Sequence, residues 1–257
     1  MTGIAQIIAA MDRTGEGWRA TLPDTWLQGR TAYGGLSTAL ALHAAQRCDA
    51  DLPPLRSAQV SFIGPLSGQV TIAATLLRRG RNAAFVQADV VGDAGLGLRA
   101  TFVFMRAIES RLDHRRGDAP PCPPPPPDAT LFRGIPAIPF TRNFEMFDQP
   151  ADTGAAEWLR WIRLADRSGL DPAVELMAIA DALPPAALKL LDGPAPVSSM
   201  TWLVNLLDPA PATTDGWWLL RATTDHAAAG SSSQAMAIWN AAGQPIAEQM
   251  QGVAIFG

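Results

Sequence analysis

The sequence predicts an α+β protein of two tandem units, each with a curved antiparallel sheet wrapped around a central helix. One observation is a repeat: an alanine-rich helical pattern followed by four strand-like runs occurs twice within 257 residues, which indicates two copies of one supersecondary unit. The other is a proline run at residues 120–127, which lacks the amide donors of a helix or central strand and marks a linker. We therefore expect an N-terminal unit at residues 1–117, a linker at 118–139 and a C-terminal unit at 140–257.

The helix of the first unit is expected at residues 33–47, where Leu36, Leu40 and His43 recur at helical spacing and alanine fills the gaps. Because such a helix is apolar on all sides, a sheet that wraps around it explains its composition. Turn signals such as Gly64-Pro65 divide the chain that follows into strand-like runs. We expect these strands at residues 57–65, 68–78, 83–91 and 97–106.

The second unit begins with a strand-like run at residues 157–165, which carries two tryptophans. A helical pattern follows at residues 174–191, with an interruption near Pro184-Pro185. A hairpin signal, Asn240-Ala241-Ala242-Gly243, separates the last two strand-like runs. We expect the strands of this unit at residues 197–207, 217–224, 231–239 and 245–256.

Short matches support an alignment of the two units. They pair residues 62–65 with 206–209, residues 93–95 with 241–243, and residues 33–35 with 176–178. Aligning the two helices places Ser37 opposite Asp181. We therefore expect the first helix to keep the architecture and the second helix to carry a carboxylate.

The composition excludes several classes of protein. With 48% hydrophobic and 17% charged residues, the chain is typical of a folded soluble protein. A net charge of -4 and a pI near 5.3 provide no positive field for nucleic acid or an anionic membrane surface. No apolar run approaches the roughly 20 residues of a membrane span, and no basic region precedes the N-terminal apolar run. We expect a cytoplasmic protein without membrane insertion.

The cysteines and histidines do not predict a metal site or a disulfide. Cys48 and Cys122 are far apart and lack CxxC spacing, which fits a reducing compartment. The histidines His43, His114 and His226 lack HxxxH and HxxE spacing, so we expect packing or surface roles for them. A serine esterase is disfavoured because the sequence has no GxSxG motif.

Four stretches resemble the acyl-CoA thioesterase II family, whose members have a double hotdog fold. They are the helix entry Tyr33-Gly34-Gly35, the strand at residues 57–65, the arginine turn at 77–82 and the last strand at 246–253. The resemblance extends from about residue 18 to residue 256. It implies a hydrolase of lipid metabolism that converts an acyl-CoA to a free acid and coenzyme A, without a cofactor.

The resemblance also implies a site made by an Asp on the second helix, a Ser or Thr on the next strand and a Gln on the last strand. Asp181 ends the second apolar helical run and takes the first place. Ser199 fits the hydroxyl position, with Thr201 as the alternative. Gln251 fits the third place, with Gln249 on the same strand face as the alternative.

The glycine pair before the first helix does not form a phosphate loop, because GxxxxGK[ST] and GxGxxG spacings are absent. We expect the glycines to let the chain pass close to a sheet before a buried helix begins, with their amides facing the site. Tyr33, Gly34 and Gly35 are therefore the predicted substrate-binding residues.

Thioester hydrolysis requires a directed water, a group that takes its proton and donors for the developing oxyanion. Asp181 fits as the base, since desolvation among apolar residues is expected to raise its pKa toward neutrality. Ser199 and Gln251 both donate and accept hydrogen bonds, which suits them to position water. The structural alternative for Asp181 is a helix-end residue held by local hydrogen bonds.

Other functions stay open at the level of the sequence. A non-catalytic acyl-CoA or lipid-binding protein would keep an apolar slot without the water-positioning residues, and a hotdog hydratase or dehydratase would need a His/Asp pattern that is not recognisable here. The arginines at residues 78–81 and at Arg111, Arg115 and Arg116 either attract coenzyme A phosphates or form a solvated face. Exposed edge strands favour association into a homo-oligomer.

Overall fold

The first expected helix and the four strands after it are present close to their expected positions. The computed structural model describes residues 2–15, 17–115, 117–148 and 153–256. Helix α2 spans Gly34–Ala45, and all of its residues from Gly35 onward are buried. Because α2 is apolar on every side, it is stable only where protein surrounds it. The strands that follow are β5 Leu55–Phe62, β6 Gly68–Arg79, β7 Ala83–Gly92 and β8 Gly95–Met105.

Several short elements lie before α2, and the sequence pattern does not predict them. Their lengths are too small for a helical or strand periodicity to be recognised. Strand β2 pairs with β6 and so extends the sheet, and β1 pairs with β2 at its edge. These elements are α1 Ile4–Ala9, β1 Asp12–Thr14, β2 Gly17–Leu22, η1 Asp24–Trp26, β3 Leu27–Gln28 and β4 Thr31–Ala32.

The second half repeats the order of strand, helix and four further strands. Strand β10, the first strand that the sequence pattern predicts in this half, also pairs with β9, which the pattern does not predict. The elements are η2 Pro139–Asn143, β9 Phe144–Phe147, β10 Glu157–Leu164, α3 Pro172–Ala180, η3 Ala186–Leu190, β11 Val197–Leu206, β12 Trp218–Ala228, β13 Ser231–Asn240 and β14 Pro245–Ile255.

Helix α3 is shorter than expected. It begins at Pro172, because the Asp171 side chain caps the helix by accepting hydrogen bonds from the next free backbone amides. It ends at Ala180 rather than near residue 191. The pair Pro184-Pro185 excludes a continuous helix here, since proline lacks the N–H donor and restricts the residue before it. The chain resumes only as the short turn η3.

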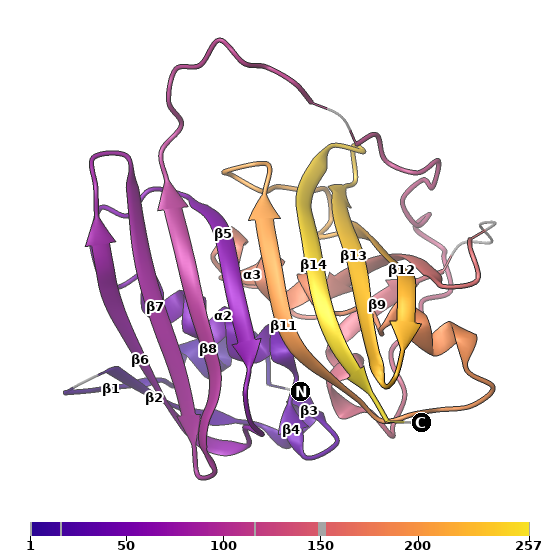
Figure 1. Cartoon of the computed structure of the whole chain (residues 1–257), viewed down its shortest axis with the longest axis horizontal. Coiled ribbons are helices and arrows are strands. Elements are labelled where there is room, and N and C mark those ends of the chain that lie inside the picture. Colours follow the sequence, from indigo (N-terminus) through magenta and orange to yellow (C-terminus); the bar gives the residue numbers. More distant parts are fainter. Residues whose placement is uncertain (1, 16, 116, 149–152, 257) are drawn as a thin grey trace.

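The two expected sheets are joined into one. The described residues form a 12-stranded antiparallel sheet in the order β1-β2-β6-β7-β8-β5-β11-β14-β13-β12-β10-β9, with α2 and α3 on one face (Figure 1). Strands β5 and β11 meet at its centre, where Ser61 pairs with Thr201 and Ser57 pairs with Asn205. The sheet is open, because β1 and β9 lie at opposite ends of the order.

The strand order is the same on both sides of the central pair. Moving outward, β5, β8, β7, β6 and β2 on one side match β11, β14, β13, β12 and β10 on the other. The register shifts also occur at matching places in the two halves. Each shift is a fixed point from which equivalent residues of the two halves are counted, because it changes which side chains face inward. The matched shifts are Leu55/Ser57 with Ser199/Thr201, Leu76/Arg78 with Thr224/His226, and Val90/Val91 with Ile238/Trp239.

The proline-rich segment is a packed connection. No helix or strand forms among its described residues from 106 to 138. Cys122 nevertheless packs against a buried cluster that includes Trp161, Trp217 and Trp239. The Trp239 Nε1 donates a hydrogen bond to the backbone oxygen of Gly117 at 2.6 Å. Cys122 and Cys48 are both free thiols.

A single tyrosine connects the two helices. Tyr33 lies at the N-cap of α2, and its hydroxyl donates a 2.8 Å hydrogen bond to the backbone oxygen of Ala178 in the last turn of α3. Its ring is buried and stacks on Phe140, with ring centroids 4.3 Å apart. Tyr33 therefore fixes the start of one helix against the end of the other.

Replacing Tyr33 by Phe should lower the free energy of unfolding by about 1–2 kcal/mol, because the ring packing stays and one buried hydrogen bond is lost. Urea unfolding followed by tryptophan fluorescence measures this change. An unaltered unfolding midpoint with an unaltered m-value would show that the bond contributes nothing to stability.

Candidate active site

Asp181 lies where the two helices meet. It is the C-cap of α3, just after the buried apolar run of that helix. The start of α2 is adjacent, and the backbone of Gly35 forms a hydrogen bond with the Asp181 carboxylate. Asp181 as a residue is half-buried, and its carboxyl group is desolvated by a largely apolar setting.

Burial changes the proton affinity of Asp181. Desolvation is the largest effect and raises the pKa of the carboxyl to about 7. Hydrogen bonds from Gln251 and from the Gly35 backbone act in the opposite direction, because they stabilise the ionised form. The group therefore exchanges its proton near neutral pH, as a general base requires.

A chain of buried amides holds one oxygen of Asp181. Gln251 Nε2 donates to Asp181 Oδ1 at 2.7 Å, and Gln234 Nε2 donates to Gln251 Oε1 at 2.6 Å. The backbone N–H of Ala186 in turn donates to Gln234 Oε1 at 3.1 Å. The predicted pair Asp181 and Gln251 is thus in direct contact, although 70 residues separate the two in sequence.

Sequence reasoning missed Gln234. A signal for it exists, because Gln234 alternates with the apolar residues Met236 and Ile238 along β13, and all three side chains are buried. Residues at alternate positions of a strand share a face, so this period-2 pattern places Gln234 toward the helices rather than toward solvent.

The register of β11 distinguishes the two hydroxyl candidates. Ser199 pairs with the buried Val253, and paired side chains in an antiparallel ladder share a face, so Ser199 is directed toward the helices. The register then shifts, and Thr201 pairs with Gly252 and is exposed on the opposite face. Among the described residues, no hydrogen bond joins the Ser199 hydroxyl to Asp181 or Gln251, so its role stays a prediction.

The competing glutamine has a different partner. Gln249 Oε1 accepts a 2.8 Å hydrogen bond from Trp202 Nε1. The Gln249 side chain is buried on the same face as Gln251, one pair further along the ladder. Contact with Asp181 therefore belongs to Gln251.

The glycine pair allows α2 to approach the carboxylate. A methyl group at Gly34 would lie 2.7 Å from Asp181 Oδ2 and 2.8 Å from a ring carbon of Phe62 in β5. This agrees with the expected close approach to the sheet. Tyr33 instead directs its ring into the core, so substrate contact through this residue stays a prediction.

The helix alignment based on short matches is wrong at Ser37. The C-caps are equivalent ends of the two helices, and they are Gln46 in α2 and Asp181 in α3. Ser37 lies in the first turns of α2, where its hydroxyl donates to the backbone oxygen of Tyr33 at 3.4 Å. The position opposite Asp181 is therefore that of Gln46.

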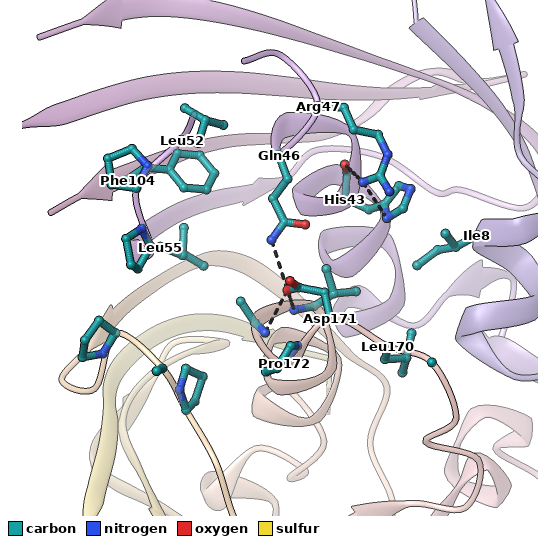
Figure 2. A pocket seen from close by; sticks show the side chains of 18 of the residues that line it. Ile8, His43, Gln46, Arg47, Leu52, Leu55, Phe104, Leu170, Asp171 and Pro172 are labelled. Atoms are coloured by element: carbon teal, nitrogen blue, oxygen red, sulfur yellow. Dashed lines mark hydrogen bonds between the residues drawn. The ribbon is translucent and has the colours of Figure 1, made fainter. Parts of the chain in front are cut away.

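A cavity of about 920 Å³ lies at the other ends of the helices (Figure 2). Gln46 Nε2 donates to Asp171 Oδ1 at 3.1 Å across it, and Asp171 also accepts from the first free amides of α3. The walls include Ile8, His43, Leu52, Phe104, Leu170 and Pro172. The cavity is thus remote from Asp181.

The sheet positions equivalent to Ser199 and Gln251 are apolar in the N-terminal half. Counted from the matched register shifts, Leu55 takes the place of Ser199 and Phe102 takes the place of Gln251. The amide end of α3 is already occupied by the carboxylate of its own cap, Asp171. We therefore place the candidate active site at Asp181 and not at this cavity.

His43 and Arg79 have structural partners in the described part of the chain. Among the described residues, no group of three or more His, Cys, Asp and Glu is placed to hold a metal ion, and no helix is long and apolar enough to cross a membrane. His43 packs edge-on against Trp18, and burial, with a smaller effect of Arg47, lowers its pKa to about 4. Arg79 forms ion pairs with Asp49 and Asp51, and Arg116 lies outside the described residues.

Comparisons with known proteins agree with this fold. A family model described as the acyl-CoA thioesterase N-terminal domain matches residues 22–105, and one described as the acyl-CoA thioesterase C-terminal domain matches residues 106–255. Among curated proteins, none matches the chain.

Three solved structures are similar over nearly the whole chain. A conserved hot dog fold protein of unknown function from Alicyclobacillus acidocaldarius is 21% identical, with a TM-score of 0.87 and coverage of 100% of this chain and 99% of that one. A proposed thioesterase II from Thermobifida fusca YX is 20% identical, with a TM-score of 0.81 and coverage of 100% and 98%. An acyl-CoA thioesterase II from Mycobacterium marinum is 18% identical, with a TM-score of 0.76 and coverage of 99% and 97%.

Replacing Gly34 by Ala should lower the free energy of unfolding by about 1–3 kcal/mol, because the added methyl group must displace Asp181 or Phe62. Gly193→Ala is a matched control, since its added methyl group has no heavy atom within 4 Å, and should change stability by less than about 0.5 kcal/mol. Equal unfolding midpoints for the two variants in urea would contradict the close approach.

Proposed function

The chain belongs to the acyl-CoA thioesterase family, and on that premise we propose that it hydrolyses the thioester of an acyl-CoA to a free acid and coenzyme A. The observation that carries the proposal is Asp181, whose carboxyl has its pKa raised by burial to about 7 and whose Oδ1 is held by Gln251. Such a group accepts a proton from water near neutral pH.

In the proposed reaction, water attacks the thioester carbonyl carbon while Asp181 takes one of its protons. A carbon–oxygen bond forms, the carbonyl becomes a tetrahedral oxyanion, and the carbon–sulfur bond then breaks. The proton held by Asp181 passes to the departing sulfur, so that coenzyme A leaves as a thiol. Because Oδ1 accepts from Gln251, Oδ2 is the oxygen that we expect to take the proton.

Ser199 and the start of α2 complete the proposed site. Ser199 lies on the helix-facing side of β11. It pairs with Val253 of β14, the strand that also carries Gln251, and this position suits a hydroxyl that holds the attacking water. The backbone amide of Gly34, at the start of α2, has no partner within the helix and suits the oxyanion, while the backbone of Gly35 already bonds to Asp181. Any contact of Tyr33 with substrate would be through its backbone, since its ring is buried.

We also propose a double hotdog with the expected division into residues 1–117, 118–139 and 140–257. The repeated strand order and the three matched register shifts support two equivalent units. A hotdog hydratase is less well supported, because the one histidine on α2, His43, packs against Trp18 at the end remote from Asp181.

Replacing Asp181 by Asn should reduce kcat/KM by at least about 100-fold, since the base is lost while the shape is kept. Release of free thiol from acyl-CoAs of several chain lengths measures this. Asp192→Asn, at an exposed position, is the control and should retain wild-type turnover. Saturable acyl-CoA binding by the wild type without turnover on any thioester would favour a non-catalytic binding protein instead.

The rate should depend on pH through Asp181. Because the base must be ionised and burial raises its pKa to about 7, kcat/KM should fall about tenfold per pH unit below that value and level off above it. A profile that stays flat down to pH 5, roughly one unit above the ordinary range for carboxyls, would exclude Asp181 as the base.

The same shift has an opposite effect on stability. The folded protein holds the Asp181 proton more tightly than the unfolded chain does, so this contribution to stability is present below the ordinary carboxyl pKa and is lost as the pH rises to about 7. Urea unfolding of the wild type and of Asp181→Asn at several pH values separates this contribution from those of other groups.

A further inference from the structure

The sheet beneath the helices is polar only in its C-terminal half. Counted from the matched register shifts, Gln234 on β13 corresponds to Val86 on β7, as Gln251 corresponds to Phe102. The two members of the first pair are buried to the same degree, at 1% and 0% exposure. A buried amide costs free energy unless its hydrogen bonds are made, so a glutamine at a position that accepts valine in the other half calls for a reason.

The hydrogen bonds of Gln234 determine the orientation of its own side-chain amide and of the Gln251 side-chain amide. The backbone N–H of Ala186 can only donate, so the Gln234 atom that faces it is Oε1 and the Gln234 Nε2 is directed at Gln251. That Nε2 can also only donate, so Gln251 must present Oε1 to it. The Nε2 of Gln251 is therefore left to face Asp181.

We propose that Gln234 is a positioning residue, which acts through Gln251 to keep a donor, rather than an acceptor, directed at the Asp181 carboxylate. This inference rests on the proposed function. Without Gln234, the terminal amide of Gln251 is free to rotate by half a turn and present Oε1 to the carboxylate. Two acceptors then face each other, which disfavours the ionised base and removes the hydrogen bond that holds Asp181 Oδ1.

The effect of the amide hydrogen bond on the pKa of Asp181 can be separated from the effects of charged groups. Burial, Gln251 and the backbone of Gly35 are what shift the pKa of Asp181, and none of these is a charged group. The titratable group that faces Asp181 from α2 is Tyr33, whose own pKa is raised well above its ordinary value by burial, so it stays neutral. Loss of the amide chain should thus move the pKa of Asp181 further upward.

The test is Gln234→Met, which keeps the length of the side chain and removes both hydrogen-bonding groups. We expect kcat to fall about tenfold with KM changed by less than about threefold, and the acidic limb of the kcat/KM profile to move to higher pH. Gln249→Met is the matched control, because this buried glutamine bonds to Trp202 and not to Asp181. It should match Gln234→Met in lost stability but keep the wild-type pH profile.

A double-mutant cycle tests whether Gln234 acts through Gln251. In a Gln251→Met background, the further change Gln234→Met should alter kcat by less than about twofold, because the residue that it orients is already gone. Additive losses would contradict the inference. The inference would also be contradicted by a Gln234→Met variant that is less stable than the wild type but has the kcat and the pH profile of the wild type.

Failure of the proposed function gives a different result. If the wild type hydrolyses no thioester, or Asp181→Asn retains full turnover, the reaction or its base is wrong. The orientation of the amides is still measurable then, because the ¹³C NMR signal of the Asp181 carboxyl titrates without any substrate. Equal Asp181 pKa values in the wild type and in Gln234→Met would overturn the inference, whatever the reaction.

Discussion

The packing of two helices that are apolar on nearly every side constrains the rest of this structure. Helix α2 has no solvent-facing stripe, so it needs the sheet on one side and α3 on another. The two helices lie side by side in opposite directions, and the hydrogen bond from Tyr33 to Ala178 fixes their relative position. This arrangement brings the start of each helix to the end of the other, and so creates two helix junctions.

The two junctions have the same geometry and different chemistry. At one, the carboxylate of Asp181 terminates α3 and bonds to the backbone of Gly35 at the start of α2. At the other, α2 ends in the neutral Gln46, and the carboxylate of Asp171 caps its own helix. A capping carboxylate is satisfied and lowers the energy of the fold, whereas the carboxylate of Asp181 is held at a cost in desolvation. Stability and reactivity are thus divided between equivalent positions.

Local signals were sufficient to predict most of the strands, because turns such as Gly80-Arg81-Asn82 and the alternation of side chains depend on near neighbours. The place of Asp181 also followed from the end of an apolar run. The central pairing of β5 with β11 and the contact of Gln234 with Gln251 depend on residues that are distant in sequence, and no local pattern specifies them. The interruption of the second helical pattern near Pro184-Pro185 was expected because proline breaks a helix, whereas the end of α3 already at Ala180 was not.

The central pairing also has a consequence during synthesis of the chain. Strand β5 is complete early, but its partner β11 begins only at Val197. A ribosome that adds about 5–20 residues per second leaves the edge of β5 without its partner for several seconds. An unpaired edge next to an incompletely covered apolar helix is a surface on which nascent chains associate. The polar outward residues of β5, among them Ser57, Gln59 and Ser61, reduce that hazard until the second half arrives.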